Sequence, residues 1–104
     1  MEKRTIYKVV KITDLNGKDR VDGGSLSRIG RIVDFDEKDV VIGRYCFLEC
    51  VVPGWDKSII TSDVQECIKA EDGYILKTLN SYYYLVDYEK SKRSPYLINE
   101  EACV

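Results

Sequence analysis

The chain has 104 residues, 44% of them hydrophobic and 33% charged, with a formal net charge of −2. This length and apolar content predict one small folded domain, residues 1–104, and exclude a disordered chain. Without a membrane-length apolar run, a signal-peptide core or a basic footprint for nucleic acid, we expect a cytoplasmic protein that contacts neither membrane nor nucleic acid.

The first third of the chain predicts two strands separated by polar turns. Residues 4–12 alternate in a strand pattern. We expect Ile6, Val10 and Ile12 on one face of that strand, with Tyr7 and Val9 on the other. Asn16-Gly17 is a hairpin signal of type I′. Residues 26–35 are predicted to form a second strand, in which Gly30 marks a bulge or sharp bend.

The middle of the chain contains its longest apolar run. Residues 40–52 are apolar on both faces, which predicts a central strand covered on both sides. Pro53-Gly54 stops this strand. Trp55 follows on the turn, where it either caps the open end of the core or, if exposed, acts as an anchor for a partner.

The segment 59–70 has two interpretations. Its apolar spacing fits one face of a helix, whereas its β-branched residues favour strands. We predict a strand through Thr61, a turn at Ser62-Asp63 and a second strand near Val64–Lys69.

Asp72-Gly73 predicts a hairpin turn whose return strand covers residues 74–79. Asn80-Ser81 then predicts a further turn or bulge, followed by a last strand over residues 82–88. Short strands between Gly-centred turns indicate an all-β fold with at most one short helix. We expect a small antiparallel barrel, SH3-like or OB-like, with a two-sheet sandwich as the alternative. An open edge strand would make a homodimer plausible.

One segment resembles a family. The pattern Thr61-Ser62-x-Val64 followed by Thr78-x-Asn80-Ser81-x-Tyr83-x-Leu85 resembles a motif of small phage and prophage proteins of Gram-positive bacteria, many of them uncharacterised. The resemblance implies a protein that binds a host protein, as inhibitors of CRISPR effectors and other defence systems do. From the residues themselves, the Thr, Asn and Ser side chains are expected to satisfy backbone groups at turns.

The tyrosines of the last strand are the first candidate site. If Tyr83 and Leu85 point inward, alternation places Tyr82, Tyr84 and Tyr88 on the opposite face. Tyrosines in such a row are typical of protein interfaces, so we predict that they bind a partner, together with Trp55. The alternatives are that other segments cover this face, or that its rings stack on nucleic-acid bases.

Three arginines are the second candidate site. Arg28, Arg31 and Arg44 are predicted to lie on strands, two of them beside glycines. Arginine forks recognise phosphate and carboxylate, so the cluster would bind a small signalling nucleotide or an acidic partner. The alternative is that these are solvated charges paired with acidic neighbours.

The chain lacks histidine, and its four cysteines, at 46, 50, 67 and 103, have no Cys-x-x-Cys spacing. We therefore predict buried thiols, no metal, no cofactor and no enzymatic activity. The predicted function is a non-enzymatic, phage- or mobile-element-encoded inhibitor that binds a host defence protein. Its alternatives are a nucleotide-binding sponge and a structural or assembly component of a phage particle.

Overall fold

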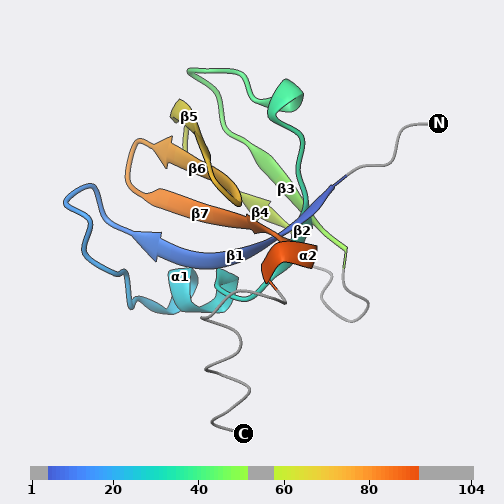
Figure 1. Cartoon of the computed structure of the whole chain (residues 1–104). Helices are drawn as coiled ribbons and strands as arrows, with labels where there is room; N and C mark the ends of the chain where they lie inside the picture. Colours follow the sequence, from blue (N-terminus) through green and yellow to red (C-terminus); the bar gives the residue numbers. More distant parts are fainter. Residues whose placement is uncertain (1–4, 52–57, 92–104) are drawn as a thin grey trace, which may run out of the picture.

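The computed structural model describes residues 5–51 and 58–91, and this part of the chain is an antiparallel β-fold (Figure 1). The strands form one sheet in the order β4-β3-β2-β1-β7-β6-β5. Their bounds are β1 (Ile6–Thr13), β2 (Ile32–Asp34), β3 (Phe47–Cys50), β4 (Ile59–Ile60), β5 (Val64–Ala70), β6 (Gly73–Thr78) and β7 (Tyr82–Asp87). The predicted all-β class is therefore confirmed.

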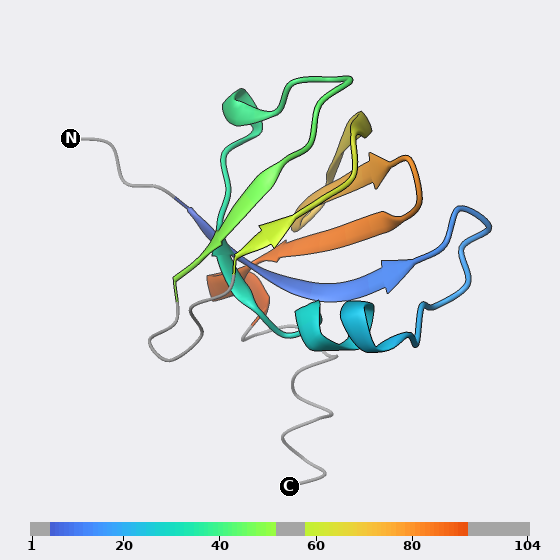
Figure 2. The ribbon, with the colours of Figure 1, turned by 180° about the vertical axis from the view of Figure 1, so that it is seen from behind.

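The sheet curls until the chain between β4 and β5 joins its two edges. β4 pairs with β3, and β5 pairs with β6. At the junction, the Gly43 N–H donates to the Val64 carbonyl at 2.8 Å, and the Val64 N–H donates to the Arg44 carbonyl at 2.8 Å. The predicted strand, turn and strand over residues 59–70 are confirmed, and the sheet wraps around one core (Figures 1 and 2).

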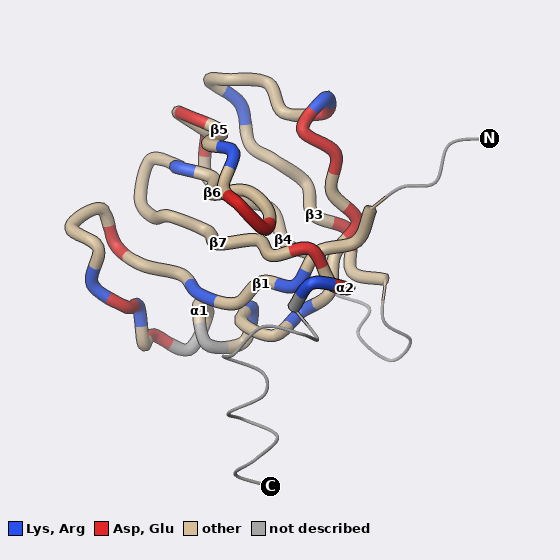
Figure 3. The backbone as a smooth tube through the Cα atoms, in the orientation of Figure 1, with Lys and Arg blue, Asp and Glu red and all other residues tan. Residues whose placement is uncertain are grey.

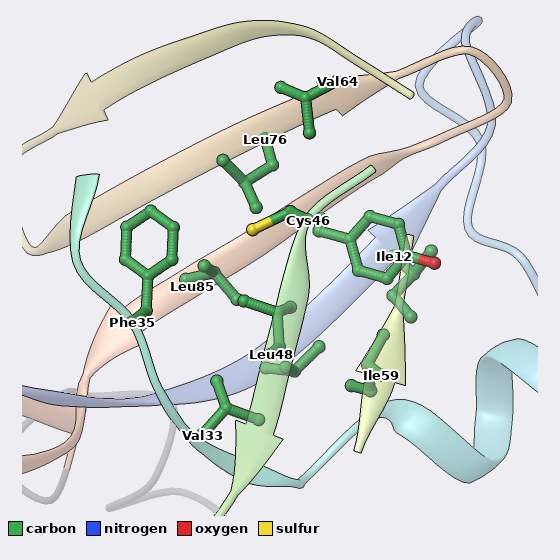
Figure 4. Packing of buried hydrophobic residues seen from close by; sticks show 11 residues of the cluster. Ile12, Val33, Phe35, Cys46, Leu48, Ile59, Val64, Leu76 and Leu85 are labelled. Atoms are coloured by element: carbon green, nitrogen blue, oxygen red, sulfur yellow. The ribbon is translucent and has the colours of Figure 1, made fainter. Parts of the chain in front are cut away.

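Every strand contributes to this core, which Figure 4 shows from close by. The buried hydrophobic residues are Val9, Ile12, Val33, Phe35, Cys46, Leu48, Ile59, Val64, Leu76, Tyr83 and Leu85. The half-buried rings of Tyr7 and Tyr74 pack against the cluster and meet each other and Phe35 at centroid distances of 5.3–5.9 Å. Aromatic contacts of this geometry contribute about 0.5–1.5 kcal/mol each beyond the area they bury.

A bulge in β1 overturns the predicted faces of the first strand. Val9 and Ile12 are both fully buried, although strict alternation places them on opposite faces. The register against β7 shifts between Val9 and Lys11, so one extra residue reverses the alternation. The core therefore receives Val9 from one side of the bulge and Ile12 from the other.

The predicted strand over residues 26–35 is largely wrong. Its first part belongs to the helix α1 (Gly23–Arg28), and β2 starts only at Ile32. Asp22 caps the helix, since its carboxylate accepts the Ser25 N–H at 3.2 Å. Gly30 then turns the chain with a φ of +94°, a conformation that favours glycine.

The predicted central strand over residues 40–52 is also wrong, because only Phe47–Cys50 is β3. A short 3-10 turn, η1 (Glu37–Asp39), and an irregular segment precede it; acidic residues gather around η1 (Figure 3). Phe47 is 55% exposed, so one face of this apolar run faces solvent. Besides α1, the helical structure described consists of single turns, η1 and α2 (Tyr88–Ser91).

The two glycine-centred hairpin signals both mark turns, with geometries other than predicted. At Asn16-Gly17 only the glycine has positive φ, so the turn is not type I′. Asp14 holds it instead, accepting the backbone N–H groups of Asn16 and Lys18 at 2.8 and 3.0 Å. Gly73 is the first residue of β6, where an added Cβ would overlap the carbonyl oxygen of Leu85.

The threonines of the TSxV and TxNSxYxL patterns bond to the backbone, as the sequence predicted. Thr61 Oγ1 accepts the Cys46 N–H at 3.0 Å and donates to the Ser62 carbonyl at 2.7 Å. Thr78 Oγ1 accepts the Ser81 N–H at 3.1 Å in the β6–β7 turn. Both threonines are buried, so these bonds satisfy backbone groups that water does not reach.

Candidate functional site

The outer face of β7 carries two of the three predicted tyrosines. Tyr83 and Leu85 are 4% and 1% exposed and point into the core, as predicted. Alternation along β7 therefore places Tyr82 and Tyr84 on the opposite face of the sheet, where both are half-buried. We call the surface around them the tyrosine face.

Paired neighbours extend the tyrosine face across four strands, β1, β7, β6 and β5. Ile75 of β6 lies opposite Tyr84, and Ile68 of β5 lies opposite Ile75. Residues directly opposite in an antiparallel ladder share one face. The tyrosine face thus includes Lys8, Lys11, Glu66, Ile68, Ile75, Lys77, Tyr82, Tyr84 and Val86.

Two lysines lie against the rings of the tyrosine face. Lys11 Nζ is 5.5 Å from the centroid of the Tyr84 ring, and Lys77 Nζ is 6.0 Å from that of Tyr82. Cation–π pairs at exposed positions contribute about 0.5–1 kcal/mol. They also hold the rings in place, so the rings lose less side-chain entropy when a partner docks on them.

Of the other two predicted partner-binding residues, Tyr88 does not belong to this row. β7 ends at Asp87, whose carboxylate accepts the N–H groups of Glu89 and Lys90 at 2.9 and 3.3 Å. Tyr88 therefore opens α2 rather than extending the strand. Trp55 lies outside the described residues.

A second, more exposed apolar surface was not predicted. Tyr45, Phe47 and Ile60 are 57%, 55% and 57% exposed, and Phe47 lies directly opposite Ile60 in the β3–β4 pair. We call these three residues the hairpin patch. The apolar run over residues 40–52 contained the signal, but its composition alone did not distinguish a covered face from an open one.

The three predicted arginines have separate environments. Arg28 lies on α1 and its Nη1 donates to the Tyr83 hydroxyl at 2.6 Å. Arg31 follows α1 and its Nε donates to the Ser27 carbonyl at 3.0 Å. Arg44 is exposed on the segment before β3. Arg28 lines a polar cavity, and there its companion is Arg20, which sequence reasoning had not singled out.

The described cysteines are free thiols: Cys46 is buried, and Cys50 and Cys67 are half-buried. Burial, followed by the charges of Cys67 and Asp39, raises the pKa of Cys46 to about 11. A thiol with this pKa stays protonated near neutral pH, so Cys46 is a poor nucleophile. Cys103 lies outside the described residues. Within residues 5–51 and 58–91, no cluster of three or more His, Cys, Asp or Glu side chains is arranged to hold a metal ion.

Comparisons with known proteins found no matching family model, no matching curated protein and no matching solved structure. In the described part of the chain, no helix is both long and apolar enough to cross a membrane.

Proposed function

We propose that this protein is a non-enzymatic binding domain that recognises another protein through the tyrosine face. The observation that carries the proposal is the pair Tyr82 and Tyr84 on the outer face of β7, each with a lysine against its ring. Tyrosine supplies a large amphipathic contact surface at a low cost in side-chain entropy, which suits an interface.

The composition of this face favours a protein partner over a nucleic acid. Ile68, Ile75 and Val86 surround the tyrosines, and Glu66 lies opposite Lys77 in the β5–β6 ladder. A site that stacks bases requires a continuous positive groove along the backbone of the nucleic acid. The mixed charges and aliphatic side chains here instead fit an apolar protein surface with a polar rim.

The resemblance to phage and prophage proteins supports a biological setting for this proposal. In that setting the partner is a host protein in the bacterial cytoplasm, and binding inhibits it, with defence proteins as the first class to test. The motif residues themselves stabilise turns, so the tyrosine face is the part that would select the target. An assembly role or a homodimer would use the same face or a sheet edge, and the oligomeric state in solution distinguishes these alternatives.

The test compares two double variants that each remove two aromatic rings from an outer surface. Tyr82→Ala with Tyr84→Ala alters the tyrosine face, and Tyr45→Ala with Phe47→Ala alters the hairpin patch. Tagged wild type and both variants, with folding confirmed by circular dichroism, are used to capture proteins from a lysate of a Gram-positive host. We expect a protein recovered by wild type and by the hairpin-patch variant to be lost with the tyrosine-face variant.

The affinity of the captured protein then gives the magnitude. Interface hot spots contribute about 2 kcal/mol or more each, so the tyrosine-face variant should bind at least about 30-fold more weakly. If only the hairpin-patch variant loses binding, the partner binds at Tyr45 and Phe47 and not at the tyrosine face. Equal binding by all three proteins would refute both surfaces.

A further inference from the structure

A polar cavity of about 340 Å³ lies between α1, β4 and the β6–β7 turn. Its volume is at the lower end of the range for small-molecule sites, about 300–1,000 Å³. The lining residues are Arg20, Asp22, Gly24, Ser25, Arg28, Ile60, Ser62, Asn80, Ser81 and Tyr83. They come from segments far apart in the sequence, so only the folded chain assembles this site.

Both arginines of the cavity are held in place by neutral groups of the β6–β7 region. Arg28 Nη1 donates to the Tyr83 hydroxyl at 2.6 Å, and Tyr83 is itself 4% exposed. Arg20 Nη1 donates to the Ser81 hydroxyl at 2.7 Å. These bonds use the Nη1 group of each guanidinium, and Arg20 also donates from Nε to Asp22, so within the described part of the chain neither side chain uses its Nη2 group. Donors therefore remain for a ligand.

The charge of the cavity is not balanced by its own residues. Asp22 is the one carboxylate among the lining residues, and it accepts from Arg20 Nε at 3.1 Å and from the Ser25 N–H at 3.2 Å. Arg28 forms no ion pair with any carboxylate among the described residues. Two guanidinium groups against one carboxylate leave a net positive charge in a half-enclosed space.

The remaining lining groups are suited to an anion with several oxygens. The hydroxyls of Ser25, Ser62 and Ser81 can donate hydrogen bonds, and arginine forks match the geometry of phosphate. A phosphate group on a small molecule has three terminal oxygens, which accept from several directions at once. Ile60 forms an apolar part of the wall, against which an organic group can pack.

We propose that this cavity binds a small organic phosphate, with Arg20 and Arg28 on the phosphate group and Ile60 against the organic part. The site is independent of the tyrosine face, because it uses Tyr83 from the inner side of β7. It also differs from the predicted arginine cluster, because Arg31 and Arg44 do not line it.

The experiment is a calorimetric titration of the full chain with glycerol 3-phosphate, AMP and GMP. Glycerol, adenosine and guanosine are the matched probes without phosphate, and inorganic phosphate and acetate are the simple anions. We expect at least one phosphate ester to bind, its dephosphorylated form not to bind, and both simple anions to bind more weakly. Any ester that binds should also raise the melting temperature, since it binds only the folded state.

Three variants locate the binding. Arg28→Gln should lower the affinity for the ester that binds by about tenfold or more, as expected for the loss of one charge-assisted hydrogen bond. Ser62→Asp leaves the Arg28–Tyr83 bond intact and adds a negative charge to the wall, so it should weaken binding similarly even if Arg28→Gln does not fold. Arg44→Gln is the matched control outside the cavity and should bind like wild type.

The proposal is overturned if none of the three esters binds, or if Ser62→Asp binds as tightly as wild type. Binding lost in Arg44→Gln would instead favour the arginines predicted from sequence. If acetate binds as tightly as an ester, the site does not select phosphate over a carboxylate, and the proposed ligand class is wrong. If inorganic phosphate binds as tightly as an ester, the organic part of the ligand contributes nothing to binding.

Discussion

The two halves of the sheet share one core but are stabilised in different ways. In the regular half, β1, β5, β6 and β7 are six to eight residues long and pair through long ladders, two of them with a single bulge. In the short half, β2, β3 and β4 are two to four residues long. There two side-chain hydroxyls take the place of a longer ladder: Thr61 accepts from the Cys46 N–H, and Ser58 accepts from the Cys50 N–H.

The outer surfaces of the two halves differ as well. In the regular half, the tyrosine rings are half-buried and each has a lysine beside it. In the short half, Val41, Ile42 and the hairpin patch are more than half exposed. Large exposed apolar side chains in one region are typical of an interaction surface. The contrast indicates that a shared core does not require equally regular strands or equally covered outer faces.

The largest expected effect tests whether the halves unfold together. Leu76 of β6 and Leu48 of β3 are both 0% exposed. Replacing either by alanine should lower the free energy of unfolding by about 2–5 kcal/mol, because each leaves a cavity in the same core. Urea unfolding followed by circular dichroism should show a lower midpoint with the same slope for both variants. An unchanged midpoint for Leu48→Ala would show that the short half does not contribute to the stability of the shared core.

A smaller effect is expected from two glycines that are required for different reasons. In the regular half, Cβ of Gly73→Ala would overlap the Leu85 carbonyl oxygen and lie 3.0 Å from Val86 Cα. In the short half, Gly43 has open space around it but a φ of +92°. We expect losses of about 1–3 kcal/mol at Gly73 from overpacking and about 1–2 kcal/mol at Gly43 from backbone strain.

Asparagine at the same two positions separates these causes in the same thermal or urea measurement. Asparagine tolerates positive φ better than alanine. Gly43→Asn should therefore recover part of the stability that Gly43→Ala loses. Gly73→Asn should be no better than Gly73→Ala, because its Cβ meets the same carbonyl. Recovery at Gly73 would contradict the steric explanation.

The last expected effect is a difference in alkaline stability. Burial raises the pKa of Cys46 in the short half from 9.0 to about 11. Burial and then Glu37 raise the pKa of Tyr74 in the regular half from 10.0 to about 12. Each folded-state group keeps a proton that the unfolded chain has lost. The free energy of unfolding should therefore fall above about pH 9 through Cys46 and above about pH 10 through Tyr74.

Two variants assign these contributions. Cys46→Ala should flatten the decline between about pH 9 and pH 11, and Tyr74→Phe should flatten it between about pH 10 and pH 12. The measurement is the urea midpoint at half-unit steps of pH, with each variant compared to itself at pH 8. A decline in Cys46→Ala equal to that of wild type would show that the thiol is solvated in the folded state.

The candidate sites were predictable only in part. Period-2 alternation correctly placed Tyr83 and Leu85 inside, and therefore Tyr82 and Tyr84 outside. Tyr88 was misplaced because the Asp87 carboxylate ends β7 by capping α2. Arg20 was missed because it shares a cavity with Arg28 only in the folded chain, where the two side chains bond to Ser81 and Tyr83.

The sequence by itself determined the all-β class and the regular half, because long alternating strands and tight turns are encoded by neighbouring residues. The structure of the short half was decided by tertiary contacts. Asp22 caps α1, but in the sequence the same residue, followed by two glycines, is equally typical of a turn. The path of residues 40–46 is set by the backbone hydrogen bonds of Gly43 and Arg44 with Val64, which is distant in the sequence. A two- to four-residue strand exists only where a partner strand is already in place, so its local pattern is too short to specify it.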